Sequence, residues 1–301
     1  MSGIVTETHP RRPELDWPDF PLGFGTGRLC GLDGGLSVSR ATWLLNQAFD
    51  LGIRLIDTAP AYGQGHAERA IGRLAPSVRD RLTICSKVGY SYGLATHWIN
   101  AAKPFLRPML PWTDALRRKI DSARHQTYTA GKILLNIEPG LIRSTLEGSL
   151  KRIHRDYVDL LLLHDPSSES VDNPANQEEF NLLVESGKIR SWGVSSSDPF
   201  VLDRAIDSMH CSVVQLPVTR DWVNENPHII PKCDERGVAI IANRVISPQV
   251  QQLDVRTLST DIEQCVSYAL HLPAVRQVLC GTRRLNHLSQ NVQIVRQLLS
   301  R

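Results

Sequence analysis

The chain of 301 residues alternates between short apolar runs and segments of helical periodicity, and this alternation repeats eight times. The apolar runs have the length of β-strands and lie at residues 21–27, 54–59, 82–88, 158–164, 189–195, 212–218, 238–244 and 275–281. The intervening and final segments predict helices at 39–52, 66–75, 141–154, 176–188, 199–208, 228–237, 259–272 and 285–300. No Gly/Ser-rich linker divides the chain. We therefore predict an α/β fold, a single (β/α)8 TIM barrel domain over residues 1–301.

A doubly wound open sheet is the alternative fold. The run VDLLLLH at 158–164 is continuously apolar, as expected of a parallel strand buried on both faces, and would suit either fold. However, the G-x-G-x-x-G fingerprint of doubly wound nucleotide-binding sheets fails, because Arg28 stands where the third glycine should fall and no helix is predicted to start there. We interpret Gly23, Gly25 and Gly27 as parts of a tight turn at the base or rim of the barrel.

Composition excludes several classes of protein. The 34 basic and 31 acidic residues nearly balance, so a nucleic-acid surface is not indicated. Six cysteines lie far apart without a C-x-x-C pair or metal-ligand spacing, which favours reduced, mostly buried thiols and predicts no metal site. The sequence contains no run of 18 uncharged apolar residues, so no membrane span is indicated. It has no apolar region near the N-terminus, so no export signal is indicated. We expect a cytoplasmic protein.

Polar residues follow three consecutive predicted strands at the point where each strand ends. Asp57 ends the second strand, with Tyr62 in the turn that follows; Lys87 ends the third and His164 the fourth. Taken singly, an aspartate at the end of a strand is more often a turn cap and a lysine a solvated charge. A lone histidine is more often a rim residue whose hydrogen bonds are satisfied. In a (β/α)8 barrel, however, the carboxyl ends of the strands open on one mouth, where active sites lie. We therefore expect the four side chains to converge.

These four side chains suit proton transfer to an oxygen atom. The reference pKa of tyrosine is about 10, so a tyrosine that acts as a general acid near neutrality needs a neighbour that makes proton loss easier. The Lys87 ammonium could be that neighbour, with Asp57 orienting it, while an imidazole could hydrogen-bond and position a substrate oxygen. Nothing in the set is an obvious nucleophile. The pattern favours protonation of an oxygen while another group attacks its carbon.

The chain resembles the aldo-keto reductase superfamily over nearly its whole length. The matching segments include RLIDTAPAYGQGHAERAIG, LTICSKVG, SLKRIHRDYVDLLLLHDP, GKIRSWGVSS and VLCGTRRLNHLSQNV. The resemblance implies that Tyr62 is the general acid/base, that Lys87 and Asp57 tune it, and that His164 orients the carbonyl. It further implies NADPH/NADP+ as the cofactor, bound across the top of the barrel without a doubly wound domain.

The same resemblance implies a set of cofactor-binding residues. The nicotinamide carboxamide would meet Ser195, Ser196 and Gln215, although Ser196 departs from the asparagine usual in the family. Asn243 or Arg244 would flank the nicotinamide ring. The adenosine phosphate pocket would lie in the segment from Gly281 onward, where Arg283 and Arg284 would face the 2′-phosphate and Gln290 and Asn291 the adenine. A guanidinium matches a phosphate well, which favours NADPH over NADH.

A long segment separates the third and fourth predicted strands. Residues 93–138 hold seven Lys or Arg against three acidic residues and carry the aromatic residues Trp98, Phe105, Trp112 and Tyr128. Because this is long for a loop between a strand and a helix, we expect an insertion that forms a helical cap over the barrel mouth. The sequence ends shortly after the last predicted helix, so we expect the cap, rather than a C-terminal tail, to shape the mouth.

Three classes of function remain open from the sequence. The first is an NADPH-dependent oxidoreductase that reduces an aldehyde, ketone or sugar hemiacetal to an alcohol, or catalyses the reverse. The second is a non-catalytic nucleotide-sensing subunit, which the complete set of four polar residues argues against. The third keeps the same residues for net non-redox chemistry in a specialised pathway. We expect a small-molecule carbonyl or alcohol as the partner, with no nucleic acid and no membrane, and leave open whether the protein is a monomer or a homo-oligomer.

Overall fold

The computed structural model describes residues 15–30, 35–92, 132–134, 136–208, 211–246 and 255–301. Within these residues, eight parallel strands close into a barrel in the order β1-β10-β9-β8-β7-β6-β3-β2. The strands are β1 (Leu22–Gly25), β2 (Leu55–Asp57), β3 (Thr83–Val88), β6 (Val158–His164), β7 (Ile189–Ser195), β8 (Val213–Pro217), β9 (Ala239–Asn243) and β10 (Val275–Cys280). Each lies inside one predicted apolar run. The predicted barrel is confirmed.

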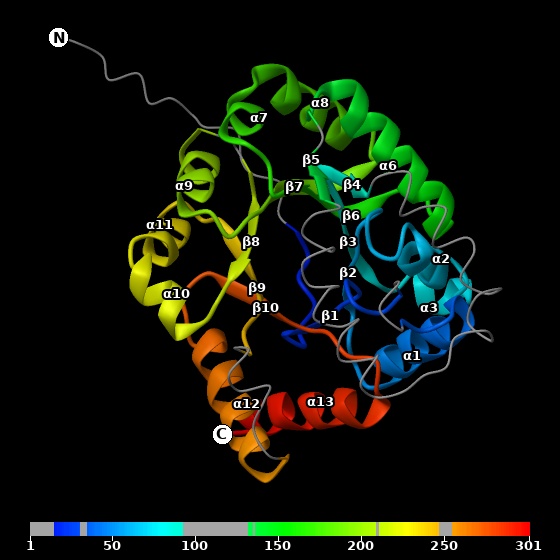
Figure 1. Ribbon diagram of the computed structural model, residues 1–301, viewed down its shortest axis with the longest axis vertical. Coiled ribbons are helices and arrows are strands. Elements are labelled where there is room, and N and C mark those ends of the chain that lie inside the picture. The colour runs from blue at the N-terminus through cyan, green and yellow to red at the C-terminus, as the bar shows by residue number, and fades with distance from the viewer. Residues whose placement is uncertain (1–14, 31–34, 93–131, 135, 209–210, 247–254) are drawn as a thin grey trace, which may run out of the picture.

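The helices form an outer ring around the strands (Figure 1). They are α1 (Val38–Asp50), α2 (His66–Gly72), α3 (Pro76–Arg79), α6 (Pro139–Ile153), α7 (Ser168–Asp172), α8 (Pro174–Glu185), α9 (Pro199–Ser208), α10 (Arg220–Glu225), α11 (Ile229–Glu235), α12 (Val255–Leu270) and α13 (Leu285–Leu299). Each predicted helix overlaps one of these. The short helices α3, α7 and α10 were not predicted, because one or two turns show no periodicity; local signals such as Pro76 at the first turn and Thr219, which accepts the Trp222 N–H, start them instead.

The strands separate two apolar cores. On β6, Leu160 and Leu162 point into the barrel, where they pack with Leu55, Cys85, Val213 and Ile241. The alternate residues Leu161 and Leu163 belong to the larger core between strands and helices. Successive side chains of a strand point to opposite faces, so a strand with a core on each side needs apolar residues at every position. This accounts for the uninterrupted LLLL sequence.

The interpretation of the N-terminal glycines as a turn is wrong for two of the three. Gly23 and Gly25 lie within β1, and only Gly27 lies in the loop that follows. A Cβ at Gly23 would come 2.6 Å from Leu55 Cδ2 and 2.8 Å from Leu279 Cδ2. Leucines of the two neighbouring strands therefore fill the space that a side chain of β1 would need, so the requirement for glycine here is one of packing inside the barrel.

The chain before β1 covers the amino end of the barrel. Leu15 and Trp17 pack against the apolar interior. Gln277, fully buried on β10, donates hydrogen bonds to the carbonyl oxygens of Pro18 at 3.0 Å and Phe20 at 3.3 Å. These contacts leave the carboxyl end as the place where polar strand-end residues can meet a ligand.

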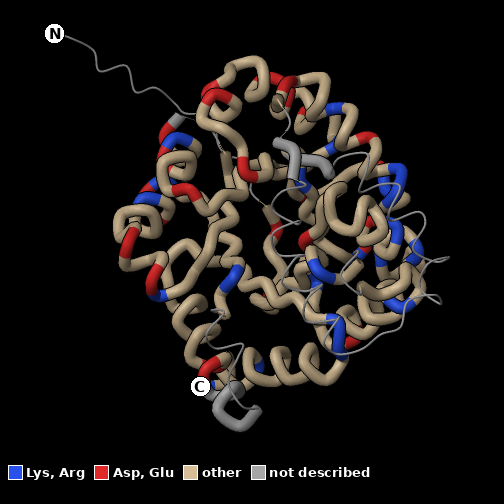
Figure 2. The backbone as a smooth tube through the Cα atoms, viewed as in Figure 1, with Lys and Arg blue, Asp and Glu red and all other residues tan. Residues whose placement is uncertain are grey.

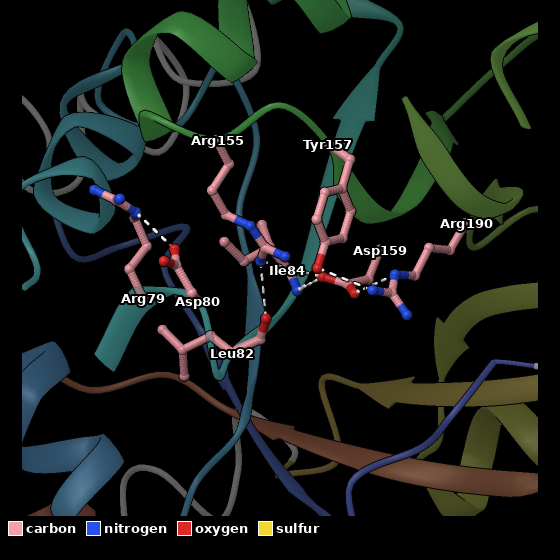
Figure 3. Close-up of polar contacts among 8 residues, drawn as sticks. All are labelled: Arg79, Asp80, Leu82, Ile84, Arg155, Tyr157, Asp159 and Arg190. Atoms are coloured by element: carbon pink, nitrogen blue, oxygen red, sulfur yellow. Dashed lines mark hydrogen bonds and ion pairs between the residues drawn. The ribbon is translucent and has the colours of Figure 1, made fainter. Parts of the chain in front are cut away.

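A group of charged and aromatic side chains joins the amino ends of the adjacent strands β3, β6 and β7 (Figure 3). We call this group, made of Arg155, Tyr157, Asp159 and Arg190, the base cluster. Buried Asp159 accepts the backbone N–H of Ile84 at 2.8 Å and lies 3.3 Å from Arg155 Nη1 and 3.4 Å from Arg190 Nε. The Arg155 and Arg190 guanidinium groups lie 4.2 and 4.7 Å from the ring centroid of Tyr157.

The two ends of the predicted insertion are paired. Strands β4 (Tyr90–Tyr92) and β5 (Lys132–Leu134) form a two-stranded antiparallel sheet in which Tyr92 pairs with Lys132. This stem begins two residues after the last residue of β3. We predicted a helical cap at residues 93–138. Of these, residues 93–131 and 135 lie outside the described residues.

Surface charge and cysteine chemistry agree with the composition. Residues of both signs are distributed over the outer helices (Figure 2). None of the six cysteines forms a disulfide and all but Cys265 are buried, which confirms the interpretation as reduced thiols. Burial raises the pKa of Cys30 to about 11, so this thiol is un-ionised near neutrality. Among the described residues, no helix is long and apolar enough to cross a membrane.

Candidate active site

Polar side chains occupy the carboxyl ends of five adjacent or facing strands. They are Asp57 on β2, Lys87 on β3, His164 on β6, Ser195 on β7 and Gln215 on β8, and all are buried. On β2, β3 and β6, each follows an apolar interior residue by two positions, so alternation turns it into the same barrel interior. Together with Tyr62, we call these residues the mouth cluster.

An ion pair forms the centre of the mouth cluster. The Lys87 ammonium, whose side chain has no exposed surface, donates to Asp57 Oδ1 and to the carbonyl oxygen of Thr58, the latter at 3.1 Å. Two buried opposite charges in contact stabilise each other's ionised form. Asp57 is itself fixed through its backbone, because both the N–H and the hydroxyl of Thr26 donate to its carbonyl oxygen at 2.9 Å.

Tyr62 and His164 lie against this ion pair. Their rings meet edge to face, with centroids 5.9 Å apart and an interplanar angle of 89°. Lys87 Nζ lies 4.9 Å from the centroid of the Tyr62 ring. The structure thus brings together all four residues that the sequence pattern singled out.

Two glycines allow the backbone around these rings to pack closely. Gly89 follows β3 with a φ of +154°, and a Cβ there would lie 2.4 Å from the carbonyl oxygen of His164. Gly63 follows Tyr62 with a φ of +57°, and a Cβ there would lie 2.3 Å from the carbonyl oxygen of Cys30. Larger residues at either position would displace His164 or the turn that carries Tyr62.

A second buried ion pair fixes the helix that follows Tyr62. Glu68 of α2 has no exposed surface, accepts from Arg152 Nε at 2.6 Å and from the Ser86 hydroxyl at 3.3 Å. Ser86 precedes Lys87 on β3 and points away from the barrel interior. The Glu68 contacts therefore hold α2 against β3 and α6, and with it the turn that contains Tyr62.

A hydrogen-bonded chain crosses the barrel to the ion pair. The Ser195 hydroxyl donates to Gln215 Oε1 at 2.7 Å, and Gln215 Nε2 donates to Asp57 Oδ1 at 2.8 Å. The sequence predicted both Ser195 and Gln215 as polar groups of the mouth but gave no sign that they contact Asp57.

The other residues expected to contact the nicotinamide lie nearby. Ser196 is buried; its hydroxyl accepts the Asp198 N–H at 3.0 Å and its own N–H donates to the Gln215 carbonyl at 3.0 Å. Asn243 is the last residue of β9. Arg244 is exposed and has a φ of +50°. This left-handed conformation ends β9 and turns the chain at the mouth.

The residues of the expected adenosine phosphate pocket follow β10 and begin α13. Gly281, Arg283 and Arg284 are exposed, while Gln290 and Asn291 are half-buried on the helix. Asn291 hydrogen-bonds the thiol of Cys280, and burial raises the pKa of that thiol to about 12. This contact turns the Asn291 side chain toward β10, which the sequence pattern did not predict.

Sequence reasoning missed Cys85 and Gly27 as members of this site. Cys85, two residues before Lys87, hydrogen-bonds Asp57, and burial together with that carboxylate raises its pKa. A Cβ at Gly27 would lie 3.4 Å from Tyr62 Cζ, so this glycine lies against the phenol end of the ring. The alternation of β3 could have identified Cys85 as an interior residue, whereas the contact of Gly27 depends on how two loops fold together.

Residues 21–250, which include the whole mouth cluster, match the sequence model of the Aldo/keto reductase family. The chain belongs to this family.

Named aldo/keto reductase relatives cover different shares of the chain. A D-threo-aldose 1-dehydrogenase from Pseudomonas sp is 29% identical over an alignment of 234 residues that covers 75% of this chain and 65% of that enzyme. A pyridoxal 4-dehydrogenase from Microbacterium luteolum is 25% identical, over 90% of this chain and 88% of that enzyme.

Solved aldo/keto reductase structures share the fold. The holo form of an aldo-keto reductase from Bacillus halodurans has a TM-score of 0.69 at 21% identity and covers 91% of this chain and 86% of its own. An aldo-keto reductase from Klebsiella pneumoniae in complex with NADPH has a TM-score of 0.63 at 19% identity and covers 95% and 90%. At these identities the likeness supports the fold alone.

The mouth of this aldo/keto reductase family member offers polar atoms to a nicotinamide cofactor. Asn243 Oδ1, on the last residue of β9, is buried and has no hydrogen-bond partner among the described residues. Buried polar atoms usually have partners, so such an atom at a barrel mouth fits a polar ligand. Gln215 lies on β8, the strand beside Asn243, and Ser195 lies on β7, the next strand along. The donor and acceptor set could therefore hold a carboxamide.

Proposed function

We propose that the chain is an NADP(H)-dependent oxidoreductase that interconverts a carbonyl group and an alcohol, with Tyr62 as the general acid/base. The convergence of Tyr62, His164 and the Lys87–Asp57 ion pair on one barrel mouth carries this proposal. The set contains a proton donor, a charge that favours loss of its proton, and a further hydrogen-bonding group. It serves a reaction in which an oxygen gains or loses a proton.

Each residue of the mouth cluster has one task in this proposal. During reduction Tyr62 donates its hydroxyl proton to the carbonyl oxygen, and during oxidation it takes that proton back. The Lys87 ammonium, 4.9 Å from the ring centroid, favours the tyrosinate that remains, and Asp57 keeps the ammonium in place. His164 hydrogen-bonds the substrate oxygen and holds it beside the phenol.

The cofactor supplies or accepts a hydride when it is bound. Ser195, Gln215 and Asn243 would hold its carboxamide, with Ser196 and Arg244 beside them. Arg283 would contact the 2′-phosphate with Arg284 nearby, and Gln290 would face the adenine. Asn291 is the least suited of the predicted residues, because it already contacts the Cys280 thiol. Gly281 leaves space where the chain turns from β10 toward α13.

A panel of substrates followed at the nicotinamide absorbance tests the proposal. It contains aldoses, pyridoxal, simple aldehydes and ketones, and the corresponding alcohols, each with NADPH, NADP+, NADH and NAD+. The names of the two relatives above place aldoses and pyridoxal first. We expect turnover with at least one carbonyl and alcohol pair, and a loss of about 10²- to 10⁴-fold in Tyr62→Phe, since the phenol proton is gone. Tyr157→Phe, at the opposite end of the barrel, is the matched control. Turnover of Tyr62→Phe equal to that of the control would refute the tyrosine acid.

Cofactor preference needs a separate measurement. Arg283→Ala is expected to weaken NADPH binding by about 1–3 kcal/mol, the range for a hydrogen bond to a charged group, and NADH binding much less. Arg296→Ala, on the exposed side of α13, is the control. Equal losses for both cofactors would show that Arg283 does not contact the 2′-phosphate.

A further inference from the structure

Gln215 reaches across the whole barrel to contact Asp57. In the closed order of strands, β8 and β2 are separated by three strands in either direction. The hydrogen bond of 2.8 Å from Gln215 Nε2 to Asp57 Oδ1 therefore joins opposite walls, between two residues that are 2% and 4% exposed. The bond therefore crosses the barrel interior directly, near the carboxyl ends of the strands.

The orientation of the Gln215 amide follows from its two partners, of which the Asp57 carboxylate can only accept. The Ser195 hydroxyl donates to Gln215 Oε1 at 2.7 Å, which leaves the NH2 group to face the carboxylate. The opposite orientation would place the amide oxygen against Asp57, where two acceptors would repel each other. The carboxylate thereby selects the NH2 group, and the Ser195 hydroxyl, which donates to Oε1, tethers the other end of the amide.

Asp57 Oδ1 thus accepts from two side chains, Lys87 and Gln215. Lys87 faces the Tyr62 ring. A change in the hydrogen bonds to Asp57 therefore changes the electrostatic potential at Tyr62 through Lys87. The other titratable groups around the carboxylate are the Cys85 thiol on β3, Tyr62 after β2 and His164 on β6.

We propose that Gln215 is a positioning residue for proton transfer, which holds Asp57 from across the barrel and so sets the ease with which Tyr62 loses its proton. This inference rests on the proposed function and deepens it. The amide that would hold the cofactor carboxamide is the same amide that holds Asp57. Each of its two polar atoms can make one more hydrogen bond, so both contacts can exist together.

The effect of removing the amide has a defined sign. The Gln215 N–H places the positive end of a dipole on Asp57. Without it, more of the Asp57 negative charge is felt by Lys87 and Tyr62, and a tyrosinate becomes harder to form. In Gln215→Leu, Tyr62 should therefore ionise at higher pH than in the wild type.

Tyrosinate absorbance of the cofactor-free protein tests this without any turnover. The titration of Tyr62 is obtained by subtracting the curve of Tyr62→Phe from that of the wild type, and the same subtraction is made in the Gln215→Leu background. We expect the midpoint to rise by about half a unit to one unit. Ser195→Ala, which removes the tether on Gln215 Oε1 and so loosens the hold of the amide on Asp57, should shift it in the same direction by less. Gln264→Leu, far from the mouth on α12, should not shift it.

An unchanged midpoint in folded Gln215→Leu would overturn the inference and leave Gln215 with a cofactor or packing role only. Should Gln215→Leu fail to fold, the Ser195→Ala titration decides in the same way. Turnover measured in parallel separates the two proposals. A shifted midpoint without carbonyl reduction by the wild type would refute the proposed function while supporting the positioning role.

Discussion

Each end of the barrel buries a carboxylate beside a cation, but the two carboxylates differ in the other groups that donate hydrogen bonds to them. In the base cluster, the backbone holds the carboxylate directly, because Asp159 accepts the Ile84 N–H at 2.8 Å. In the mouth cluster, Asp57 Oδ1 is held by side chains, from Lys87 and Gln215. Backbone partners cannot move without unfolding a strand, whereas side-chain partners can respond to a ligand.

The same strands carry both clusters. Ile84 and Lys87 lie on β3, and Asp159 and His164 lie on β6. The comparison shows that residue type alone does not distinguish the ion pair at the mouth from the ion pair at the base. Both clusters also place a tyrosine beside a cation, Tyr157 at the base and Tyr62 at the mouth. What separates them is position along the strand, because the carboxyl ends of the strands are where the active sites of such barrels lie.

The largest expected difference between the clusters is in turnover. Lys87→Met removes the charge beside Tyr62, and we expect turnover of the folded protein to fall by about 10²- to 10⁴-fold. Lys188→Met, which breaks a part-exposed pair with Glu147 at 3.0 Å, is the matched control and should retain activity. Initial rates on protein of verified melting behaviour provide the measurement. A loss of only a few-fold in Lys87→Met would remove the lysine from the mechanism.

At the base, the expected loss is in stability. Asp159→Ala leaves the buried Arg155 guanidinium without its carboxylate, which we expect to lower the free energy of unfolding by about 3–5 kcal/mol. Below its melting range, the variant should keep wild-type turnover. Denaturant titration and initial rates measure the two quantities. Asp80→Ala, on an exposed aspartate that pairs with Arg79, should change stability by less than about 0.5 kcal/mol. Equal losses in the two variants would contradict the special role of the base cluster.

The base cluster should also add a smaller, pH-dependent term to stability. Burial raises the pKa of Asp159, against the opposing effects of the Ile84 N–H, Arg155 and Arg190. The folded state therefore binds a proton more readily than the unfolded chain, whose aspartate has a pKa of about 3.9. This contribution is present below that unfolded value and is lost as the pH rises through the folded one. Denaturant titrations of the wild type and Asp159→Asn over this range should show the wild type losing stability relative to the variant. If the wild type instead gains stability relative to Asp159→Asn as the pH rises, the expected direction of the Asp159 pKa shift is wrong.

The smallest expected effect is at the rim of the base cluster. The Arg190 side chain is 56% exposed, whereas that of Arg155 is 4% exposed. Arg190→Ala should therefore cost about 0.2–1 kcal/mol and less in high salt, because exposed ion pairs are weak and screened. Arg155→Ala should cost more and depend little on salt. If Arg190→Ala proves the more damaging of the two, burial does not govern this cluster.

The sequence predicted the barrel and the convergence of Asp57, Tyr62, Lys87 and His164 at its mouth because both depend on short-range patterns. Apolar runs of strand length set the eight strands, and a polar residue at the end of a strand is placed at the mouth by the fold itself. The bond between Gln215 and Asp57 was not predictable in this way. It joins residues 158 positions apart and depends on which strands face each other across the closed ring.

Other features escaped prediction for different physical reasons. Three of the four base-cluster residues lie in RIHRDYVDL, where Arg155 and Asp159 look like ordinary polar residues between a helix and a strand. The fourth, Arg190, comes from another strand. Gly23 was misread because the leucines that require it come from two other strands. The predicted roles of Arg283, Gln290 and Asn291 concern a ligand, and such roles stay predictions until binding is measured.

The antiparallel stem of β4 and β5 has a consequence for how this family member could diversify. Because Tyr92 and Lys132 are paired, the chain leaves and re-enters the fold at one point. The entropy cost of closing a loop grows only by about 0.6 kcal/mol for each doubling of its length, so insertions and deletions between these residues should be tolerated by the barrel. The stem starts directly after Gly89, whose backbone lies against His164. We therefore expect that segments of different length and chemistry can be exchanged between β4 and β5 while the residues of the mouth cluster keep their positions.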